Sequence, residues 1–184
     1  MSKNILILNG SPRLKGNTAM LCEAFTKGAE STGHTVTRFD LQKMNIHGCL
    51  GCMKGGKDLV SPCVQKDDME KIYPAYSKAD LVVLASPMYY WSVSGQLKTA
   101  FDRLFAVAEC DPNYANPHKE CVLIMAAEGD STNNWKPVLD YYHSLIGFLN
   151  WTDKGQVLAG GVMDAGAVFG KPVLDEAFRF GESL

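Results

Sequence analysis

The sequence predicts an α/β protein built on a doubly wound, five-stranded parallel sheet with strand order 2-1-3-4-5. Strand-like and helix-like stretches alternate five times along the 184 residues, and repeated strand–helix units form parallel sheets with right-handed crossovers. The stretch at residues 79–86 is largely apolar, as expected of a strand that helices cover on both faces. No linker, repeat or low-complexity run divides the chain, so residues 1–184 are predicted to form one domain.

The first elements of the chain each have a local signal. An apolar run predicts a buried strand at residues 3–8. The first helix is expected at residues 17–31, because this stretch has an apolar face and Gly33 is placed to end it. Residues 34–40 are rich in strand formers and are expected to form the second strand, although their apolar alternation is imperfect.

A long irregular segment, residues 41–66, separates the second strand from the second helix. It holds four glycines, one proline and three cysteines, and a loop this long inside a compact domain usually serves a function. A helix capped by Asp67 or Asp68 follows. It is expected to end near residue 78, and Pro74 should make it short or kinked.

The second half of the chain continues the same alternation. Its strands are expected at residues 79–86, 120–127 and 156–162. Its helices are expected at residues 95–108, 135–149 and 172–180, with Pro137 near the first turn of the second one, where proline is tolerated.

The bulk composition excludes several classes of partner. The net charge of −2 gives no basic surface for nucleic acid and no polybasic patch for membranes. No apolar run approaches the length of a transmembrane helix, and the N-terminus has no signal-peptide pattern. We therefore expect a cytoplasmic protein. Its six cysteines are expected to be thiols rather than a disulfide framework.

The stretch at residues 9–18 lies between the first strand and the first helix and is rich in small, polar and basic residues. A strand–loop–helix turn of this kind directs backbone N–H groups and a helix N-terminus at one point, which favours a phosphate. The side chains that can add donors are the hydroxyls of Ser11 and Thr18, the amide of Asn17 and the guanidinium of Arg13. The alternative is an ordinary loop in which Asn17 or Thr18 caps the helix.

A second distinctive loop, residues 86–95, follows the third strand. Tyr89, Tyr90 and Trp91 are adjacent there, and their flat faces suit stacking on a planar ring, while Met88 offers a soft apolar contact. The alternative is a subunit interface, where aromatic residues are also enriched. With strand order 2-1-3-4-5, the two loops meet at the topological switch point between the first and third strands, where ligands bind.

These two loops and the helix after them resemble the NAD(P)H-dependent FMN reductase branch of the flavodoxin-like superfamily. The resemblance rests on G-S-P-R-x-x-G-N-T at residues 10–18, A-D-L-V-V-L-A-S-P-M-Y-Y at residues 79–90 and S-G-Q-L-K-T-A-F-D-R at residues 94–103. It covers roughly residues 3–130. The resemblance implies a flavodoxin-like fold, FMN as cofactor, and NADH or NADPH as co-substrate. It also implies a homodimer or a higher homo-oligomer.

The resemblance also assigns residues to the cofactor. It implies that the FMN phosphate is held by Ser11, Arg13, Asn17 and Thr18, with Gly16 in the same turn. It implies that the isoalloxazine ring is bordered by Pro87, Met88, Tyr89, Tyr90 and Trp91, and on its other side by Glu128, Gly129 and Asp130. Carboxylates beside a flavin disfavour its anionic reduced form, so at least one of the two acidic residues is expected to point to solvent. No catalytic acid or base is named, because the protein supplies position and electrostatics for hydride transfer to flavin N5.

Three cysteines in the long irregular segment form the pattern C-x2-C-x10-C at Cys49, Cys52 and Cys63. The segment resembles that of iron–sulfur flavoproteins, which carry four closely spaced cysteines and a [4Fe–4S] cluster. Here Gly55 stands where the third cysteine is expected, so we predict no metal. Zinc completed by His47 and a redox disulfide of the C-x-x-C pair remain alternatives.

The predicted function is therefore an FMN-dependent oxidoreductase that uses NADH or NADPH to reduce a small acceptor, such as a quinone, a free flavin or an aromatic electrophile. Three alternatives remain open: a flavodoxin-type electron carrier, a metal-containing flavoprotein and a phosphate-binding regulatory domain without flavin. The S-P-R loop and the nearly neutral charge are evidence against a flavodoxin-type electron carrier. The aromatic loop speaks against the regulatory domain.

Overall fold

The computed structural model describes all 184 residues and confirms the predicted parallel sheet. The sheet has the order β2-β1-β3-β4-β5, and every neighbouring pair is parallel. Its strands are β1 (Asn4–Asn9), β2 (Thr35–Asp40), β3 (Leu81–Pro87), β4 (Glu120–Ala126) and β5 (Thr152–Ala159).

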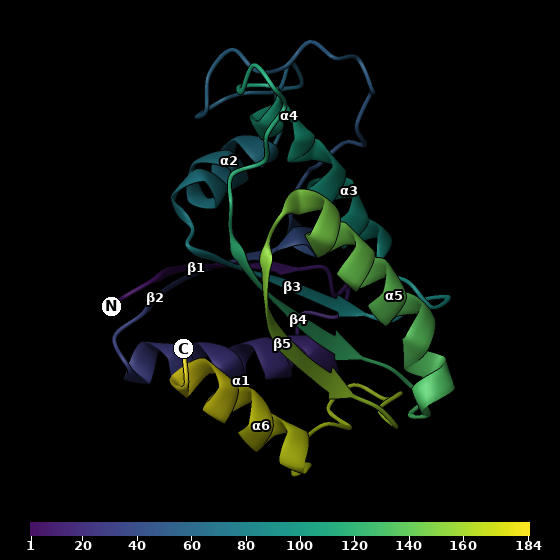
Figure 1. Cartoon of the computed structure of the whole chain (residues 1–184). Coiled ribbons are helices and arrows are strands. Elements are labelled where there is room, and N and C mark those ends of the chain that lie inside the picture. The colour runs from purple at the N-terminus through teal and green to yellow at the C-terminus, as the bar shows by residue number, and fades with distance from the viewer.

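Helices cover both faces of the sheet, as a doubly wound fold requires (Figure 1). One face carries α1 (Asn17–Ser31) and α6 (Pro172–Glu182), which pack against each other. The other side carries α2 (Met69–Lys78), α3 (Gly95–Arg103), the short α4 (Phe105–Ala108) and α5 (Thr132–Leu149). A single 3-10 turn, η1 (Leu41–Lys43), follows β2.

Two hydrophobic cores lie on the two faces, and alternate residues of the central strands enter different cores. Val82 and Leu84 of β3 belong to the core under α2, α3 and α5. Leu81, Val83 and Ala85 belong to the core under α1 and α6. Because successive side chains of a strand point to opposite faces, an unbroken apolar run is the pattern that a central strand needs here.

The fifth strand lies four residues earlier than predicted at its start, so the prediction of residues 156–162 was wrong. The first half of β5 is polar and exposed, which hid it from a search for apolar runs. It is one of the two edge strands of the sheet, and polar residues commonly protect such edges. The register shifts between Cys121 and Val122 of its neighbour, and Gly155 takes φ +122° beside this irregularity.

Two helices also differ from the prediction. The fifth helix starts at Thr132 rather than residue 135, because the Ser131 side chain caps it by accepting a hydrogen bond from Asn134 N–H at 3.2 Å. Residues 95–108 form two helices separated at Leu104 rather than one. The carbonyl oxygen of Arg103 at this break accepts a hydrogen bond from the Tyr73 hydroxyl at 3.3 Å.

The segment between η1 and α2 has no regular secondary structure, yet a buried ion pair fastens its two ends. Arg103 donates to Asp67 at 2.6 Å and 3.2 Å and to the His47 carbonyl oxygen at 2.8 Å. Burial would raise the pKa of the Asp67 carboxyl, but hydrogen bonds from Arg103 and from the backbone N–H groups of His47 and Met69 together lower it. The pair therefore anchors the long segment to the end of α3.

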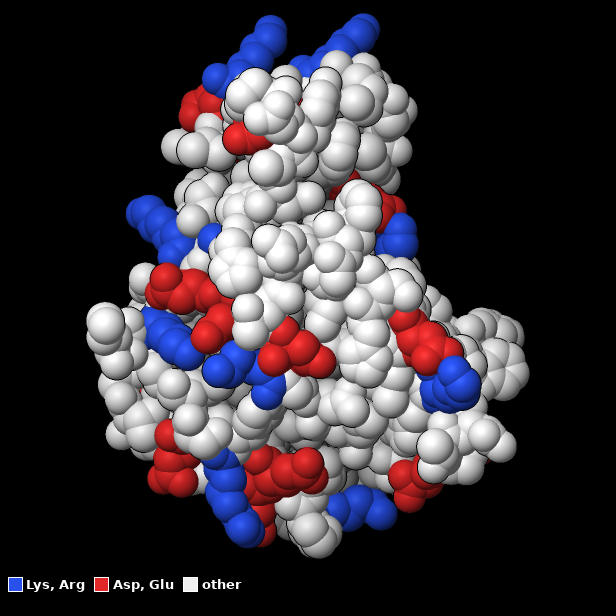
Figure 2. All heavy atoms as spheres, viewed as in Figure 1, with Lys and Arg blue, Asp and Glu red and all other residues white.

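The surface carries charges of both signs. On the face in Figure 2, Lys and Arg side chains are interspersed with Asp and Glu, and a broad central strip has neither. None of the helices combines the length and the apolar character needed to cross a bilayer.

Candidate functional site

A cavity of about 260 Å³ lies at the carboxyl ends of β1, β3 and β4, where the switch point was expected. It joins the loop after β1 with the loop after β3. The residues that line it are Ser11, Arg13, Gly16, Asn17, Thr18, Pro87, Met88, Tyr89, Ala126, Ala127, Glu128, Val162 and Met163. Nine of the thirteen predicted site residues are in this set; Tyr90, Trp91, Gly129 and Asp130 are not.

Short polar contacts shape the loop after β1. The Asn9 side chain accepts from Ser11 N–H at 3.2 Å and donates to Asp40 at 2.9 Å. The Ser11 hydroxyl accepts from Arg13 N–H at 3.2 Å and donates to the Arg13 carbonyl oxygen at 3.1 Å. A turn closes when Gly16 N–H donates to the same carbonyl at 2.9 Å. The chain is thus folded tightly into the start of α1.

The N-terminus of α1 is open toward the cavity. Gly16 occupies the N-cap position, so no side chain caps the helix. The first helical hydrogen bond is that of Met20 N–H to Gly16, and the N–H groups of Asn17, Thr18 and Ala19 have no acceptor in the chain. Such unpaired N–H groups and the positive end of the helix dipole attract a negatively charged group. The alternative of Asn17 or Thr18 as the cap is therefore wrong.

The side chain of Asn17 is used within the protein. Its Nδ2 donates to the carbonyl oxygens of Val162 at 3.2 Å and Asp164 at 2.9 Å. Its Oδ1 accepts from Val168 N–H at 3.2 Å. Both amide hydrogens are committed, so a ligand can receive a hydrogen bond from Asn17 only through its backbone N–H. The amide donor expected from the sequence instead fixes the loop after β5.

Arg13 spans the mouth of the cavity. Its Nη1 donates to the Met163 carbonyl oxygen at 2.9 Å, which holds the guanidinium beside the loop after β5 while the side chain stays exposed. Lys15 lies in the same loop and is equally exposed, but it does not line the cavity. The two basic residues of this loop are therefore not equivalent.

Two serines join the loops of the site. Ser94 caps α3 by accepting from Leu97 N–H at 3.2 Å, and its hydroxyl donates to the Gly10 carbonyl oxygen at 2.7 Å. Ser86 accepts from Ser94 N–H at 2.7 Å. The loop after β3 is thus closed at its base and tied to the loop after β1.

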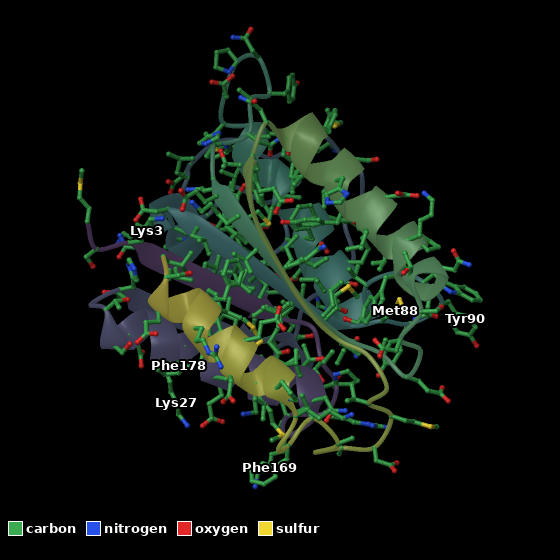
Figure 3. All side chains as sticks on the ribbon, turned by 60° about the horizontal axis from the view of Figure 1, so that its bottom comes forward. Lys3, Lys27, Met88, Tyr90, Phe169 and Phe178 are labelled. Carbon is green, nitrogen blue, oxygen red and sulfur yellow. The ribbon has the colours of Figure 1, made fainter.

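The aromatic loop forms a two-residue turn. Tyr89 and Ser92 pair across it, and the two residues between them, Tyr90 and Trp91, take φ of 48° and 59°. Turns of this hand normally use Asn and Gly, and bulky residues are strained in them. The Tyr90 side chain is 96% exposed and points away from the sheet beyond Met88 (Figure 3). Met88 and Tyr89 line the cavity, whereas Tyr90 and Trp91 lie outside it.

The loop after β4 contributes one acidic side chain. Glu128 and Asp130 are both exposed, but only Glu128 lines the cavity. The Asp130 side chain instead packs on Gly160, where any Cβ atom would overlap the carboxyl oxygen. Glycine at this position lets the Asp130 side chain lie directly against the loop after β5.

Sequence reasoning missed four lining residues. Ala126 is the last residue of β4 and Ala127 follows it, and Val162 and Met163 follow β5. The alanines are small enough to leave the cavity open at its floor. A usable signal was the position of both pairs directly after a strand, at the edge of the sheet where the ligand was expected. The misplaced fifth strand hid the second pair.

These features fit FMN in their chemistry. The uncapped end of α1 with Arg13 offers donors for a phosphate, and the other end of the cavity has apolar and aromatic walls at Met88 and Tyr89. Ligand sites usually enclose about 300–1,000 Å³, and the cavity of about 260 Å³ lies just below this range.

Comparison with known proteins gives relatives of two kinds. An iron–sulfur flavoprotein of Archaeoglobus fulgidus is 38% identical over 95 residues, which is 52% of this chain and 42% of that protein. The chain spans about half the length of the iron–sulfur flavoproteins that it matches. Among solved structures, an NAD(P)H:quinone oxidoreductase from Methanothermobacter marburgensis has a TM-score of 0.76 at 21% identity. That match covers 100% of this chain and 97% of the other.

A second similar structure is an FMN-dependent NADH-azoreductase from Bacillus anthracis in complex with FMN, with a TM-score of 0.67 at 16% identity and 97% and 96% coverage. At these identities the two structures support the fold. The family model described as NADPH-dependent FMN reductase matches residues 3–161, which is most of the chain and includes both loops of the site. FMN is the cofactor of this family, with a nicotinamide nucleotide as its reductant. The chain thus belongs to the NADPH-dependent FMN reductase family.

Proposed function

We propose that the protein is an FMN-dependent oxidoreductase that takes reducing equivalents from NADH or NADPH and passes them to a small acceptor. Quinones, free flavins and aromatic electrophiles are the acceptor classes. The observation that supports this most is the single cavity that joins the open N-terminus of α1 to the Met88–Tyr89 wall. When bound, FMN supplies a ring that accepts a hydride at N5 and then reduces the acceptor.

The chain's own residues would hold and orient the cofactor. The backbone N–H groups of Asn17 and Thr18 would donate to the phosphate, and Arg13 and the Ser11 hydroxyl would complete its surroundings. Pro87, Met88 and Tyr89 would border one side of the ring. Glu128 would lie near the other side. No side chain is assigned as an acid or a base, because binding, orientation and exclusion of water are what this chemistry requires of the protein.

The remaining site residues take outer positions in this proposal. Tyr90 and Trp91 would meet only the part of the ring that extends past the cavity. Gly129 would allow the loop after β4 to come close to the cofactor. Gly16 would leave the start of α1 uncapped. We further propose that residues 1–184 act as one cytoplasmic domain, and that it assembles as a homodimer or a higher homo-oligomer.

The test is an anaerobic titration of the FMN-loaded protein with NADH and with NADPH, followed by its visible absorbance. Bleaching of both flavin bands, and their return when a quinone is added, are expected. Flavin bands that neither nucleotide bleaches would indicate an electron carrier and overturn the proposal. A protein that takes up no FMN would overturn it as well.

Variants of one loop test how the phosphate is held. Arg13→Gln should weaken FMN binding roughly 10- to 100-fold, since a charged hydrogen bond contributes about 1.5–3 kcal/mol. Lys15→Gln removes the same charge from the same loop without touching the cavity. It should therefore leave the affinity nearly unchanged. Equal losses in the two variants would mean that net charge, rather than contact with Arg13, controls binding.

A further inference from the structure

A second, smaller cavity shares no residue with the flavin site and is lined by the segment between η1 and α2 together with the end of α3. It encloses about 30 Å³, and Cys49, Cys52 and Cys63 all line it together with Arg103 at the end of α3. Three of the six cysteines thus converge on one small space. Cys52 and Cys63 are half-buried, and Cys49 is exposed.

A four-cysteine cluster site does not fit these residues. Position 55 is glycine, and a Cβ atom placed there would overlap Glu109 Oε2 and lie 3.0 Å from the Pro62 carbonyl oxygen. A glutamate carboxylate, rather than a fourth thiolate, therefore lies beside position 55. His47 does not line this cavity, and its Nδ1 lies 3.5 Å from Asp67. No group of three or more potential ligands is arranged to hold a metal ion.

An unused donor distinguishes this cavity from an ordinary packing defect. Arg103 is 1% exposed, and its terminal nitrogens bind Asp67 and backbone carbonyls, but its Nε–H has no acceptor. Leaving a buried charged donor unpaired is costly. Cys63 lines the same cavity as Arg103 and lies beside the Tyr73 hydroxyl.

Chain geometry selects the pair of thiols. A disulfide needs Cα atoms within about 7 Å, and residues three apart reach that distance through a turn. The chain makes no turn between Cys49 and Cys52. Cys52 and Cys63 both line the cavity, and the hydrogen bond from Gly56 N–H to the Pro62 carbonyl oxygen, 2.9 Å, closes the chain between them into a loop.

We propose that this cavity is a thiol–disulfide redox site in which Cys52 and Cys63 form a reversible disulfide, with a low-molecular-weight disulfide as the oxidant. In the reaction the two thiols lose two protons and two electrons and form one S–S bond. The S–S bond of the oxidant breaks, and its two halves leave as thiols through a mixed-disulfide intermediate.

The other cysteines provide internal references. Cys22 and Cys121 are fully buried, and burial raises the pKa of both thiols to about 12, so they should stay reduced. Cys110 is half-buried like Cys52 but lines a different hollow. It therefore serves as a matched control with similar access and no partner thiol in its cavity.

The experiment treats the FMN-loaded protein with glutathione disulfide, then alkylates the remaining thiols in denaturant and maps the peptides. Oxidation should lower the number of alkylatable thiols from six to four and join the peptides of Cys52 and Cys63. A reductant should restore all six. Cys63→Ser should form no internal disulfide, whereas Cys110→Ser should form the same one as the unaltered chain.

Four results would overturn the proposal. These are six thiols that survive the treatment, a glutathione adduct confined to Cys49, a bond between Cys49 and Cys52, and stoichiometric iron or zinc in the purified protein that protects the three thiols. All readouts are thiol counts, peptide maps or metal content. They therefore do not depend on whether the flavin site works as proposed.

Discussion

Gly10 is the residue at which the two loops of the flavin site are packed most tightly together. Its N–H donates to the Ala85 carbonyl oxygen at 2.8 Å and its carbonyl accepts from the Ser94 hydroxyl. In Gly10→Ala the new Cβ atom would lie 2.5 Å from Ser94 Oγ and 2.7 Å from Leu97 Cβ, whereas ordinary contacts begin at 3.4 Å. Both neighbours are buried in the start of α3, so α3 must move or Ser94 must release its cap.

The cost follows from these contacts. Overpacking a tight core site costs about 1–3 kcal/mol, and loss of a serine N-cap costs about 1 kcal/mol. We therefore expect Gly10→Ala to lose about 3 kcal/mol of unfolding free energy. For a domain of this size that is a fall in Tm of roughly 6–12 °C. FMN binding should weaken as well, because the displaced loop lines the end of the cavity where the phosphate is proposed to bind.

Thermal unfolding of the FMN-free protein, read by circular dichroism, measures this effect. Gly95→Ala is the control, because Gly95 begins α3 beside the same junction and a Cβ atom there meets nothing within 4 Å. Its Tm should stay unchanged or rise slightly. If the two variants melt within about 2 °C of each other, the packing argument for this junction is wrong.

Further predictions concern the anchor of the long segment and the packing of α1 on α6. Asp67→Asn should lose about 3–5 kcal/mol, because it leaves the buried charge of Arg103 without a partner. The Asp67 pKa is lowered in the folded chain, so its stabilisation is present above the ordinary carboxyl pKa and is lost as the pH falls through the lowered value. The Tm difference between the unaltered chain and Asp67→Asn should thus be constant from about pH 5 upward and shrink below about pH 4. A difference that does not change in acid would contradict this. Gly28→Ala should also lower the Tm by several degrees, since its Cβ atom would overlap the Phe178 carbonyl oxygen. Gly147→Ala, in open space on α5, should raise the Tm slightly, and similar shifts in both variants would exclude this cause.

The parts of the fold that sequence patterns predicted are those where local chemistry and tertiary surroundings agree. β3 is apolar except for Ser86 because both of its faces are buried, and α1 begins and ends at the predicted residues 17 and 31. The start of β5 was predicted wrongly because this edge strand is polar for half its length. No local pattern reveals that tertiary requirement.

In the candidate site, too, local patterns predicted some residues, whereas contacts between distant segments could not be predicted. A loop rich in small, polar and basic residues before a helix predicts an anion site from local rules alone, so Ser11 and Gly16 could be named from the sequence. The partners of a long polar side chain depend on distant segments. The hydrogen bonds of Asn17 to residues 162–168 join positions about 150 apart in sequence, and only the folded chain shows that its amide is occupied. The roles of these site residues in cofactor binding stay predictions.

The Asn17 contacts have a consequence for how far the functional unit extends. The match to the reductase family ends at residue 161, but Asn17 binds Val162, Asp164 and Val168, all beyond that point. The same loop continues into α6, which packs on the far end of α1. The helix whose N-terminus would meet the phosphate in the proposed function is therefore held at both ends by residues outside the shared segment. Sequence changes there can tune how firmly the cofactor is held without any contact with it.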